Sequence, residues 1–384
     1  MKNNLLLLSL AVIALLYACE QATIKQELVI EQVEAKWVSD SRVDVFDVEL
    51  VYSQDALVVK GETTIPQAKD ELLLKLEQSN KLVDSLVVLP SSSIEKKWAI
   101  TTLSIANLRD EPRHSAQLVS QTIMGTPVRI LKQEGGWSLV QSPDRYIAWT
   151  NNSSLAFIDE AEFNAWRSGR RVFVLCDGWL EDGFGHHVSD LVKGSLLTVV
   201  EKQKDKVLLS LPDGRSGTVG ADVVREFEMA GALPTLESQD LIEVSKEFMG
   251  LPYLWGGTSS KAVDCSGFLK NIYFLNGYIL ARDASQQIKY GQPITLQVEA
   301  LQVGDLLFFG DAESKKVTHV GMYIGDTEFI HSSGCVKVNS LDETRDNYSG
   351  YRKASWLGAQ RYIGHAPGDG LMPVNQHPWY VNHK

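Results

Sequence analysis

The sequence lacks the features that would point to nucleic acid as a partner of the folded chain. It contains no long run of lysine or arginine, and its formal net charge is -11. Because phosphate groups are bound by concentrated basic patches, we exclude nucleic acid as a partner, and acidic polymers are poor candidate substrates. After the first segment the chain is expected to be globular, and 384 residues predict two to four domains.

Cysteine is also scarce. The four cysteines are Cys19, Cys176, Cys265 and Cys335, and no Cys-x-x-Cys pair is present. A disulfide scaffold is therefore not the organising principle of the fold. In an oxidising compartment an exposed thiol is a liability unless it is used, which favours a catalytic role for one cysteine. Spacing alone does not say which one.

Residues 1–19 have the form of a lipoprotein signal peptide. The apolar run Leu5–Leu16 is too short to span a bilayer comfortably. Leu16-Tyr17-Ala18-Cys19 resembles a bacterial lipobox, although Tyr17 replaces the usual small residue. The resemblance implies lipidation of Cys19 and an exported protein, periplasmic or at the cell surface, that is anchored to a membrane by this lipid. Secretion after cleavage nearby is the alternative.

Residues 20–92 are expected to form a small α/β module. Apolar residues alternate over residues 43–50, a second strand follows over 57–59, a helix over 67–78 and a strand over 85–89. The resulting ββαβ order carries no chemical signature, so we expect a spacer or docking domain.

Residues 93–160 and 168–230 are expected to form two small β-barrels. Both segments have short strands separated by turn residues. The first has the pattern Asn-Leu-Arg-x-x-Pro, Gly-x-Pro-Val, Gly-Trp-x-x-Val and Tyr-x-x-Trp, which resembles the bacterial SH3-like domain, and the second is a looser copy.

Residues 236–366 change to an α+β pattern, with helices before an antiparallel sheet. Helices are predicted over Leu241–Met249 and over Cys265–Asn276, which Gly277 ends. The predicted strands cover residues 306–309, 318–324, 328–332 and 336–339. The tail, residues 367–384, is expected to lie along the surface of this domain.

Three residues of this domain predict a cysteine nucleophile. Cys265 starts a helix that Asp264 is placed to cap, and the first amide groups of a helix stabilise a thiolate and an oxyanion. His319 and His331 flank a hairpin turn near Gly325, so both rings can lie on one face. We assign Cys265 as nucleophile, His319 as general base and His331 as the group that orients His319.

Two other interpretations of these residues remain open at this point. Cys265 could be a buried core residue with incidental histidines, since free cysteine is commonly part of a core. A zinc site could use Cys265, His319, His331 and Cys335, but the tight spacing of zinc-binding cysteines is absent.

Six motifs decide between these interpretations. They are Leu-Pro-Tyr-Leu-Trp-Gly-Gly from 251, Asp-Cys-Ser-Gly from 264, Arg-Asp-Ala from 282 with Gln287, Gly-Asp-Leu-Leu-Phe-Phe from 304, His-Val-Gly-Met-Tyr-Ile-Gly from 319 and Phe-Ile-His-Ser-Ser from 329. Together they closely resemble the NlpC-type family of bacterial cell-wall cysteine peptidases, which are papain-like in fold. The resemblance covers residues 238–363 and implies cleavage of amide bonds in peptidoglycan stem peptides, with neither cofactor nor metal.

The resemblance also assigns further residues to the site. It implies that Tyr253 contributes to the oxyanion environment and that Trp255, Asp264, Ser266 and Asp283 line the substrate cleft. The alternatives are structural: a helix cap for Asp264, an aromatic plug for Tyr253 and a second cap for Asp283.

Two SH3-like domains before such a domain resemble one subgroup, the γ-D-glutamyl-L-diamino acid endopeptidases of the dipeptidyl-peptidase VI type. The resemblance implies that Glu111 and Tyr146 hold the free amine of an N-terminal L-alanine, as part of murein peptide recycling. The alternatives are a solvated turn residue for Glu111 and a barrel core residue for Tyr146.

The implied substrate is a murein tripeptide or tetrapeptide, cut between γ-D-glutamate and the diamino acid, and we expect a monomer. Two alternative functions remain: a wall-lytic hydrolase that acts on intact peptidoglycan, and a noncatalytic wall-binding protein.

Overall fold

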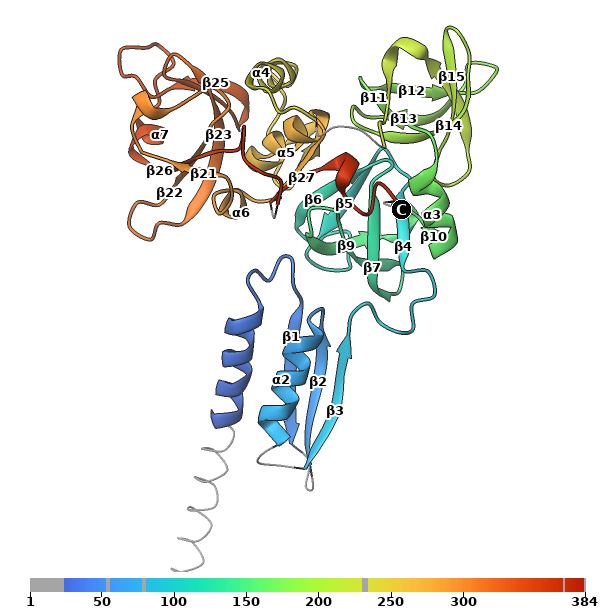
Figure 1. The fold of residues 1–384 in the computed structure, drawn as a ribbon, viewed down its shortest axis with the longest axis vertical. Coiled ribbons are helices and arrows are strands. Elements are labelled where there is room, and N and C mark those ends of the chain that lie inside the picture. Colours follow the sequence, from blue (N-terminus) through green and yellow to red (C-terminus); the bar gives the residue numbers. More distant parts are fainter. Residues whose placement is uncertain (1–23, 53–55, 78–80, 230–233, 369, 383–384) are drawn as a thin grey trace, which may run out of the picture. The chain divides into compact units, whose positions relative to one another are not determined.

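The structure is a computed structural model that describes residues 24–382 apart from 53–55, 78–80, 230–233 and 369 (Figure 1). The chain forms two compact units, the first ending at Ile94 and the second beginning at Glu95. Among the described residues, no helix is both long and apolar enough to cross a membrane. Cys19 lies outside the described residues, so its lipidation stays a prediction.

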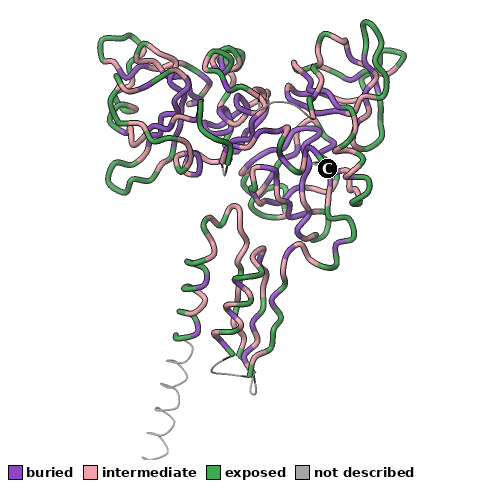
Figure 2. Tube along the Cα trace, in the orientation of Figure 1, coloured by how far each residue is buried: buried purple, intermediate pink, exposed green. Residues whose placement is uncertain are grey.

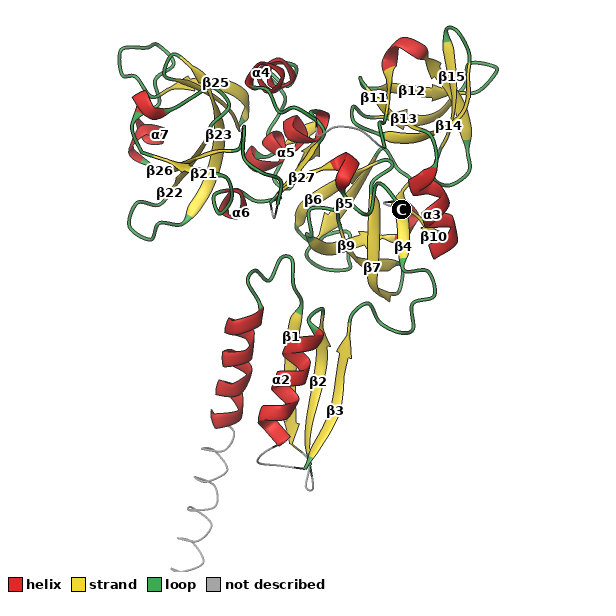
Figure 3. Ribbon diagram, in the orientation of Figure 1, coloured by secondary structure: helices red, strands yellow, loops and turns green. Residues whose placement is uncertain are grey.

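The first unit has the β, β, α, β order that its apolar pattern predicts. Its elements are β1 (Phe46–Tyr52), β2 (Leu57–Thr63), α2 (Pro66–Glu77) and β3 (Leu82–Val88). β2 pairs antiparallel with β1 and parallel with β3, because α2 carries the chain across the sheet between β2 and β3 (Figure 3). The structure adds a helix over residues 24–37, whose buried Val33 shares a core with Leu57 and Leu72.

The first barrel is a seven-stranded sheet with the order β10-β4-β7-β8-β9-β5-β6. Its strands are β4 (Trp98–Thr101), β5 (Ile105–Arg109), β6 (Leu118–Ile123), β7 (Pro127–Glu134), β8 (Trp137–Gln141), β9 (Ile147–Asn151) and β10 (Leu155–Ile158). The alternating residues Ala106 and Leu108 are buried, as expected for strands with one face in a core. β4 and β10, which the turn pattern did not indicate, pair with each other and extend the sheet.

The second barrel repeats this architecture. The helix α3 (Glu160–Ser168) leads into it, and its sheet has the order β13-β12-β16-β15-β14-β11-β17. The strands are β11 (Arg171–Val174), β12 (Gly178–Glu181), β13 (His187–Leu191), β14 (Leu196–Lys202), β15 (Lys206–Ser210), β16 (Ser216–Gly220) and β17 (Val224–Glu226). Met124 of the first barrel is fully buried in the core of the second, so the two barrels pack directly on each other.

The third domain is a six-stranded sheet, β21-β26-β22-β23-β24-β25, with helices packed against it. Its helices are α4 (Ser238–Lys246), α5 (Cys265–Leu275), α6 (Ala284–Gln287) and α7 (Gly350–Ala354), and its strands are β21 (Gln292–Ile294), β22 (Leu306–Gly310), β23 (Val317–Gly325), β24 (Glu328–Ser333), β25 (Cys335–Ser340) and β26 (Trp356–Arg361). Two short strands, β18 (Thr258–Ser259) and β19 (Ala262–Val263), precede α5. The predicted α+β order is confirmed.

The helix α5 packs against the sheet of this domain. Phe268, Leu269 and Ile272 of α5 are fully buried, in one core with Val320 and Met322 of β23. Figure 2 shows much of α5 in the colour of buried residues. This packing holds the first residue of the helix beside β23. Each fully buried side chain of this size stabilises the fold by about 1.5–3 kcal/mol.

The C-terminal tail is not the surface strap that the sequence suggests. β27 (Leu371–Pro373) pairs with β20 (Tyr278–Leu280), and Tyr380 is 2 % exposed. The Tyr380 carbonyl accepts a hydrogen bond from Arg171 Nη2 at 2.6 Å. Tyr380 belongs to a core with Phe173 of the second barrel and Ile279 of the third domain. The tail therefore joins parts of the chain that are distant in sequence, and large aromatic side chains supply the buried area.

Candidate active site

The candidate nucleophile Cys265 is the first residue of α5 and is 7 % exposed. Asp264 caps the helix, since its Oδ1 accepts the Gly267 N–H at 2.7 Å. At Gly267 an added Cβ would lie 2.1 Å from the Gly257 carbonyl oxygen, so this turn accepts only glycine. The expected helix start and cap are confirmed.

The thiol of Cys265 is buried against β23. Burial is the main cause that raises its pKa to about 11, and the charge of Asp264 adds to this. Backbone N–H groups of Val320 and Ser266 act in the opposite direction. The helix start thus contributes as expected, but desolvation outweighs it, and the thiol is protonated at rest rather than a preformed thiolate.

His319 on β23 and His331 on β24 face each other across the predicted hairpin. Their Nε2 and Nδ1 atoms lie 2.7 Å apart, and the rings meet at 87°. The pairings Met322 with Ile330 and Tyr323 with Phe329 make the two histidines diagonal neighbours rather than directly opposite ones. Gly321 lies between them in this ladder, where a Cβ would come 3.0 Å from that of His331.

Asn339 on β25 fixes the orientation of His331, and the sequence analysis did not identify it. Its Oδ1 lies 2.9 Å from His331 Nε2, while its amide nitrogen donates to the Asn347 carbonyl at 2.8 Å. Because Oδ1 can only accept, His331 carries its proton on Nε2 and accepts at Nδ1 from His319 Nε2–H. His319 is left with a lone pair on Nδ1, which is the nitrogen that a general base needs.

Both imidazoles are neutral at neutral pH. Burial is the main cause that holds the pKa of His319 well below 6.5, and the positive charge of Arg352 adds to it. Burial likewise lowers the pKa of His331 to about 4, although the Asn339 hydrogen bond opposes this. A neutral thiol and a neutral imidazole pair are suited to proton transfer during the reaction rather than before it.

The zinc alternative does not match this geometry. Both ring nitrogens of His331 are engaged, one by His319 and one by Asn339. Across the described part of the chain, no three His, Cys, Asp or Glu side chains are grouped so that they could hold a metal ion.

A buried arginine, Arg282, organises the other side of the nucleophile, and the sequence analysis gave it no role. It is 1 % exposed, and its Nη2 donates to Asp264 Oδ2 at 2.6 Å. It also donates to Ser266 Oγ at 3.0 Å and to Ser120 Oγ of the first barrel at 2.9 Å. Both Asp264 oxygens are therefore engaged, and Asp264 is a helix cap and an arginine partner together. Asp283 lies 3.7 Å from Arg282 and caps α6.

The two residues expected from the first barrel lie in different environments. Tyr146 is 6 % exposed, and it interacts electrostatically with Arg282, beside Asp264. Glu111 is exposed, and both of its oxygens are bound by Arg113, at 2.8 and 3.0 Å. The structure thus brings Tyr146 close to Arg282 and Asp264. The Glu111 carboxylate is instead bound by Arg113.

Tyr253 and Trp255 lie just upstream of the nucleophile. Tyr253 is half-buried, and desolvation, followed by the charge that Cys265 would carry as a thiolate, raises its pKa, so its hydroxyl stays a hydrogen-bond donor. Trp255 is 60 % exposed. A protonated phenol beside the thiol is suited to stabilise an oxyanion, and an exposed indole is available to a ligand.

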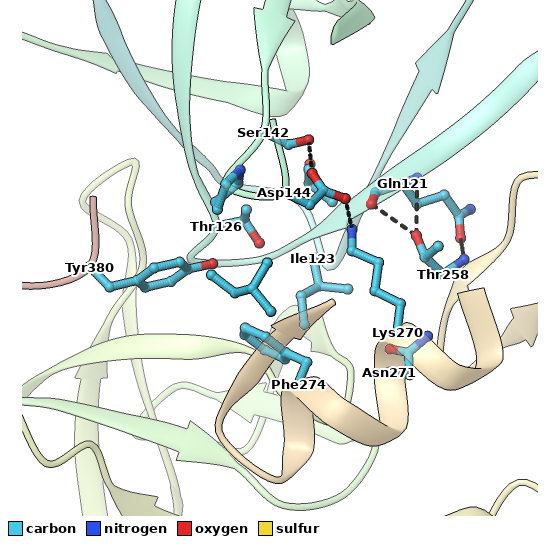
Figure 4. A pocket seen from close by; sticks show the side chains of 13 residues that line it. Gln121, Ile123, Thr126, Ser142, Asp144, Thr258, Lys270, Asn271, Phe274 and Tyr380 are labelled. Atoms are coloured by element: carbon cyan, nitrogen blue, oxygen red, sulfur yellow. Dashed lines mark hydrogen bonds and ion pairs between the residues drawn. The ribbon is translucent and has the colours of Figure 1, made fainter. Parts of the chain in front are cut away.

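The first barrel is fixed to α5 by a buried polar interface (Figure 4). Lys270 of α5 pairs with the buried Asp144 at 2.7 Å, and Gln121 and Thr258 exchange hydrogen bonds of 2.9–3.0 Å. A cavity of about 50 Å³ remains between these groups, and Tyr380 lines its far side. These contacts link the first barrel to the domain that carries the nucleophile.

Comparison with known proteins agrees with this architecture. Residues 250–361 match the NlpC/P60 family, and residues 108–155 match the bacterial dipeptidyl-peptidase Sh3 domain. The chain is 32 % identical over 270 residues to dipeptidyl-peptidase 6 of Lysinibacillus sphaericus, with 65 % of this chain and 94 % of that protein covered. The chain belongs to the NlpC/P60 family.

Two further matches each cover about two thirds of this chain. A γ-D-glutamyl-L-lysine dipeptidyl-peptidase of Bacillus cereus is 28 % identical over 261 residues, which cover 64 % of this chain and 76 % of that protein. The crystal structure of an NlpC/P60 family protein from Bacillus cereus superposes with a TM-score of 0.61 at 26 % identity, over 69 % of this chain and 99 % of that one. The predicted family and fold are therefore confirmed.

Proposed function

We propose that this NlpC/P60 protein is a cysteine endopeptidase that hydrolyses the γ-D-glutamyl–diamino acid bond of murein tripeptides or tetrapeptides with a free N-terminal L-Ala. The observation that carries the proposal is the hydrogen-bonded pair of His319 and His331 beside the helix that begins at Cys265. The name of the Bacillus cereus relative, a γ-D-glutamyl-L-lysine dipeptidyl-peptidase, supports the substrate class.

The proposed reaction uses the free nitrogen of His319. His319 Nδ1 takes the Cys265 proton while the sulfur attacks the γ-carbonyl carbon of D-glutamate. The hydroxyl of Tyr253 stabilises the resulting oxyanion. His319 then gives the proton to the leaving amine, the carbon–nitrogen bond breaks, and a thioester with L-Ala-γ-D-Glu remains. Water attacks this thioester, His319 again takes the proton, and L-Ala-D-Glu is released as the thiol is restored.

Selectivity for a free amine would come from the first barrel. We place the L-Ala ammonium near Tyr146 and Glu111, with Trp255, Asp264, Ser266 and Asp283 lining the cleft. An ammonium held by a carboxylate in a closed cleft is a charge-assisted contact. Both Asp264 oxygens are already engaged, so Glu111 would supply the carboxylate that binds the ammonium. To do so, Glu111 would release Arg113, which binds it in the absence of substrate. Intact wall, whose L-Ala is amidated, would not be bound.

The cellular site follows from the N-terminal segment. We propose that Cys19 carries a lipid that anchors the protein to a membrane, in the periplasm or at the cell surface, where the chain acts as a monomer on released wall peptides. Metabolic labelling with a fatty acid tests this: wild type should be labelled, and a Cys19→Ser variant should not.

The test of the activity is a matched pair of tripeptides, one with a free N-terminus and one acetylated. Mass spectrometry should find L-Ala-D-Glu and the diamino acid from the free peptide, and little turnover of the acetylated one. Equal rates would instead favour a wall-lytic hydrolase. Unchanged function after alkylation of Cys265 would favour a noncatalytic binding protein.

A further inference from the structure

The short helix α7 places a cationic side chain, Arg352, beside the two histidines. Its guanidinium lies 5.6 Å from the centre of the Phe309 ring and 3.4 Å from Ser333 Oγ, at the end of β24. The Phe309 ring lies in turn 5.9 Å from the ring of His319. Arg352 thus lies close to the general base, next to side chains from both strands that flank β23.

Arg352 differs from the other arginines of this domain in its partners. Arg282 and Arg361 pair with Asp264 and Asp305, at 2.6 and 2.8 Å. Within the described part of the chain, no carboxylate lies within ion-pair distance of Arg352. Its guanidinium lies near the rings of Phe309 and Tyr351 and donates to the Ser333 hydroxyl, and its charge also interacts with Cys265 and Tyr253. It is half-buried, and burial lowers its pKa. A partly desolvated cation of this kind favours an anionic ligand.

A second cation, Lys337, lies near His331. Lys337 on β25 is directly opposite His331 in the ladder, and directly opposite residues project from the same face of a sheet. The charges of Arg352 and Lys337 both disfavour protonation of His319 and His331. The positive charges of Arg352 and Lys337 therefore both act on the histidine pair.

The chemistry of the reaction places the leaving group next to His319. His319 must deliver its proton to the leaving nitrogen, so the residue that departs lies next to His319. The other side, where Arg282 and Ser120 join the start of α5 to the first barrel, is left for the L-Ala-γ-D-Glu part. A residue that leaves next to His319 would therefore lie within reach of Arg352.

We propose that Arg352 binds a carboxylate of the residue on the leaving side of the scissile bond, with Lys337 adding to the positive field. This inference rests on the proposed function and extends it from the acyl side to the leaving side. The carboxylate has two possible sources. It is the α-carboxylate when the diamino acid ends the peptide, or the side-chain carboxylate of a dicarboxylic diamino acid such as diaminopimelate.

Four tripeptides distinguish these sources: L-Ala-γ-D-Glu followed by lysine, lysine amide, diaminopimelate or diaminopimelate α-amide. Arg352→Gln should lower kcat/KM about 10- to 100-fold, mainly through KM, on peptides that carry the recognised carboxylate. On the lysine amide, which has no carboxylate on the leaving side, the loss should be at least about 10-fold smaller, because only the effect of the Arg352 charge on the catalytic groups remains. Arg352→Lys, which keeps the charge but not the paired donors, should recover part of the loss. Lys353→Gln, at an exposed neighbouring position of α7, is the matched control.

The pattern of loss decides the outcome. A loss that follows the free α-carboxylate, or one that follows diaminopimelate, supports the proposal and identifies the source. No loss, or an equal loss on all four peptides with an unchanged melting temperature, overturns it, because Arg352 would then be idle or act only on the catalytic groups. If wild type cleaves none of the four, the proposed function fails, and this inference fails with it.

Discussion

The Nε2 atom of His319 lies 2.7 Å from Nδ1 of His331, and this contact determines which nitrogen of His319 can act as a base. His331 donates from its other nitrogen to Asn339, so it must accept from His319. Asn339 therefore sets, through His331, which nitrogen of His319 carries the proton, although Asn339 itself does not contact the nucleophile. Several consequences of this arrangement can be measured.

Asn339 should matter for turnover although it does not contact the substrate. Asn339→Leu removes the acceptor for His331, so the wrong tautomer becomes populated and kcat should fall on the order of 10- to 100-fold. Asn339→Asp keeps an acceptor and should lose less. Steady-state kinetics on the free-amine tripeptide checks this prediction, and an Asn339→Leu enzyme with the wild-type kcat would show that the tautomer is not controlled by Asn339.

The buried histidines should make the fold sensitive to acid. The pKa values of His331 and His377 are both lowered to about 4, chiefly by burial, so the unfolded chain binds more protons as the pH falls below 6.5. Each should cost about 3 kcal/mol of stability by pH 4. Urea unfolding between pH 7 and pH 4 measures this loss. His377→Gln should show a shallower decline than wild type, and an identical decline would contradict the assignment.

Arg282 should be essential for the stability of the site. Arg282→Met leaves the buried Asp264 without its charged partner, which typically costs about 3–5 kcal/mol. Arg345→Gln, in a more exposed ion pair with Glu328, should change stability by less than about 1 kcal/mol. Thermal unfolding of the two variants compares them. Similar melting temperatures would mean that the Asp264 charge is already satisfied by backbone groups.

Tyr380 should stabilise the unit that holds the barrels and the peptidase domain. Tyr380→Ala removes a fully buried ring and should cost about 3–5 kcal/mol. Phe184→Ala, at an 88 % exposed position, is the control and should have little effect. Chemical denaturation gives both values. An equal effect of the two substitutions would show that the tail is not part of the core.

The parts of the fold that local patterns encode could be predicted from the sequence. The capped start of α5 at Asp264, the hairpin between His319 and His331, and the strands that flank it all follow from residues close together in the chain. Family motifs also include the three residues assigned to catalysis.

The remaining features depend on contacts between distant segments. Arg282 reaches Ser120 across 162 positions of the sequence, and Arg171 reaches the Tyr380 carbonyl across 209. Neither periodicity nor turn residues indicate a partner so distant in the sequence. The burial of the tail and the role of Arg282 could therefore not be predicted. The raised pKa of Cys265 was missed for a similar reason, because the desolvation that outweighs the helix start comes from packing around the thiol.

The most direct test of the central claim is intact-protein mass spectrometry after acid quench during turnover of L-Ala-γ-D-Glu-diaminopimelate, followed by peptide mapping. The account predicts a transient L-Ala-γ-D-Glu adduct on the peptide that contains Cys265, and neither adduct nor turnover in Cys265→Ala. Undiminished turnover by Cys265→Ala would contradict it.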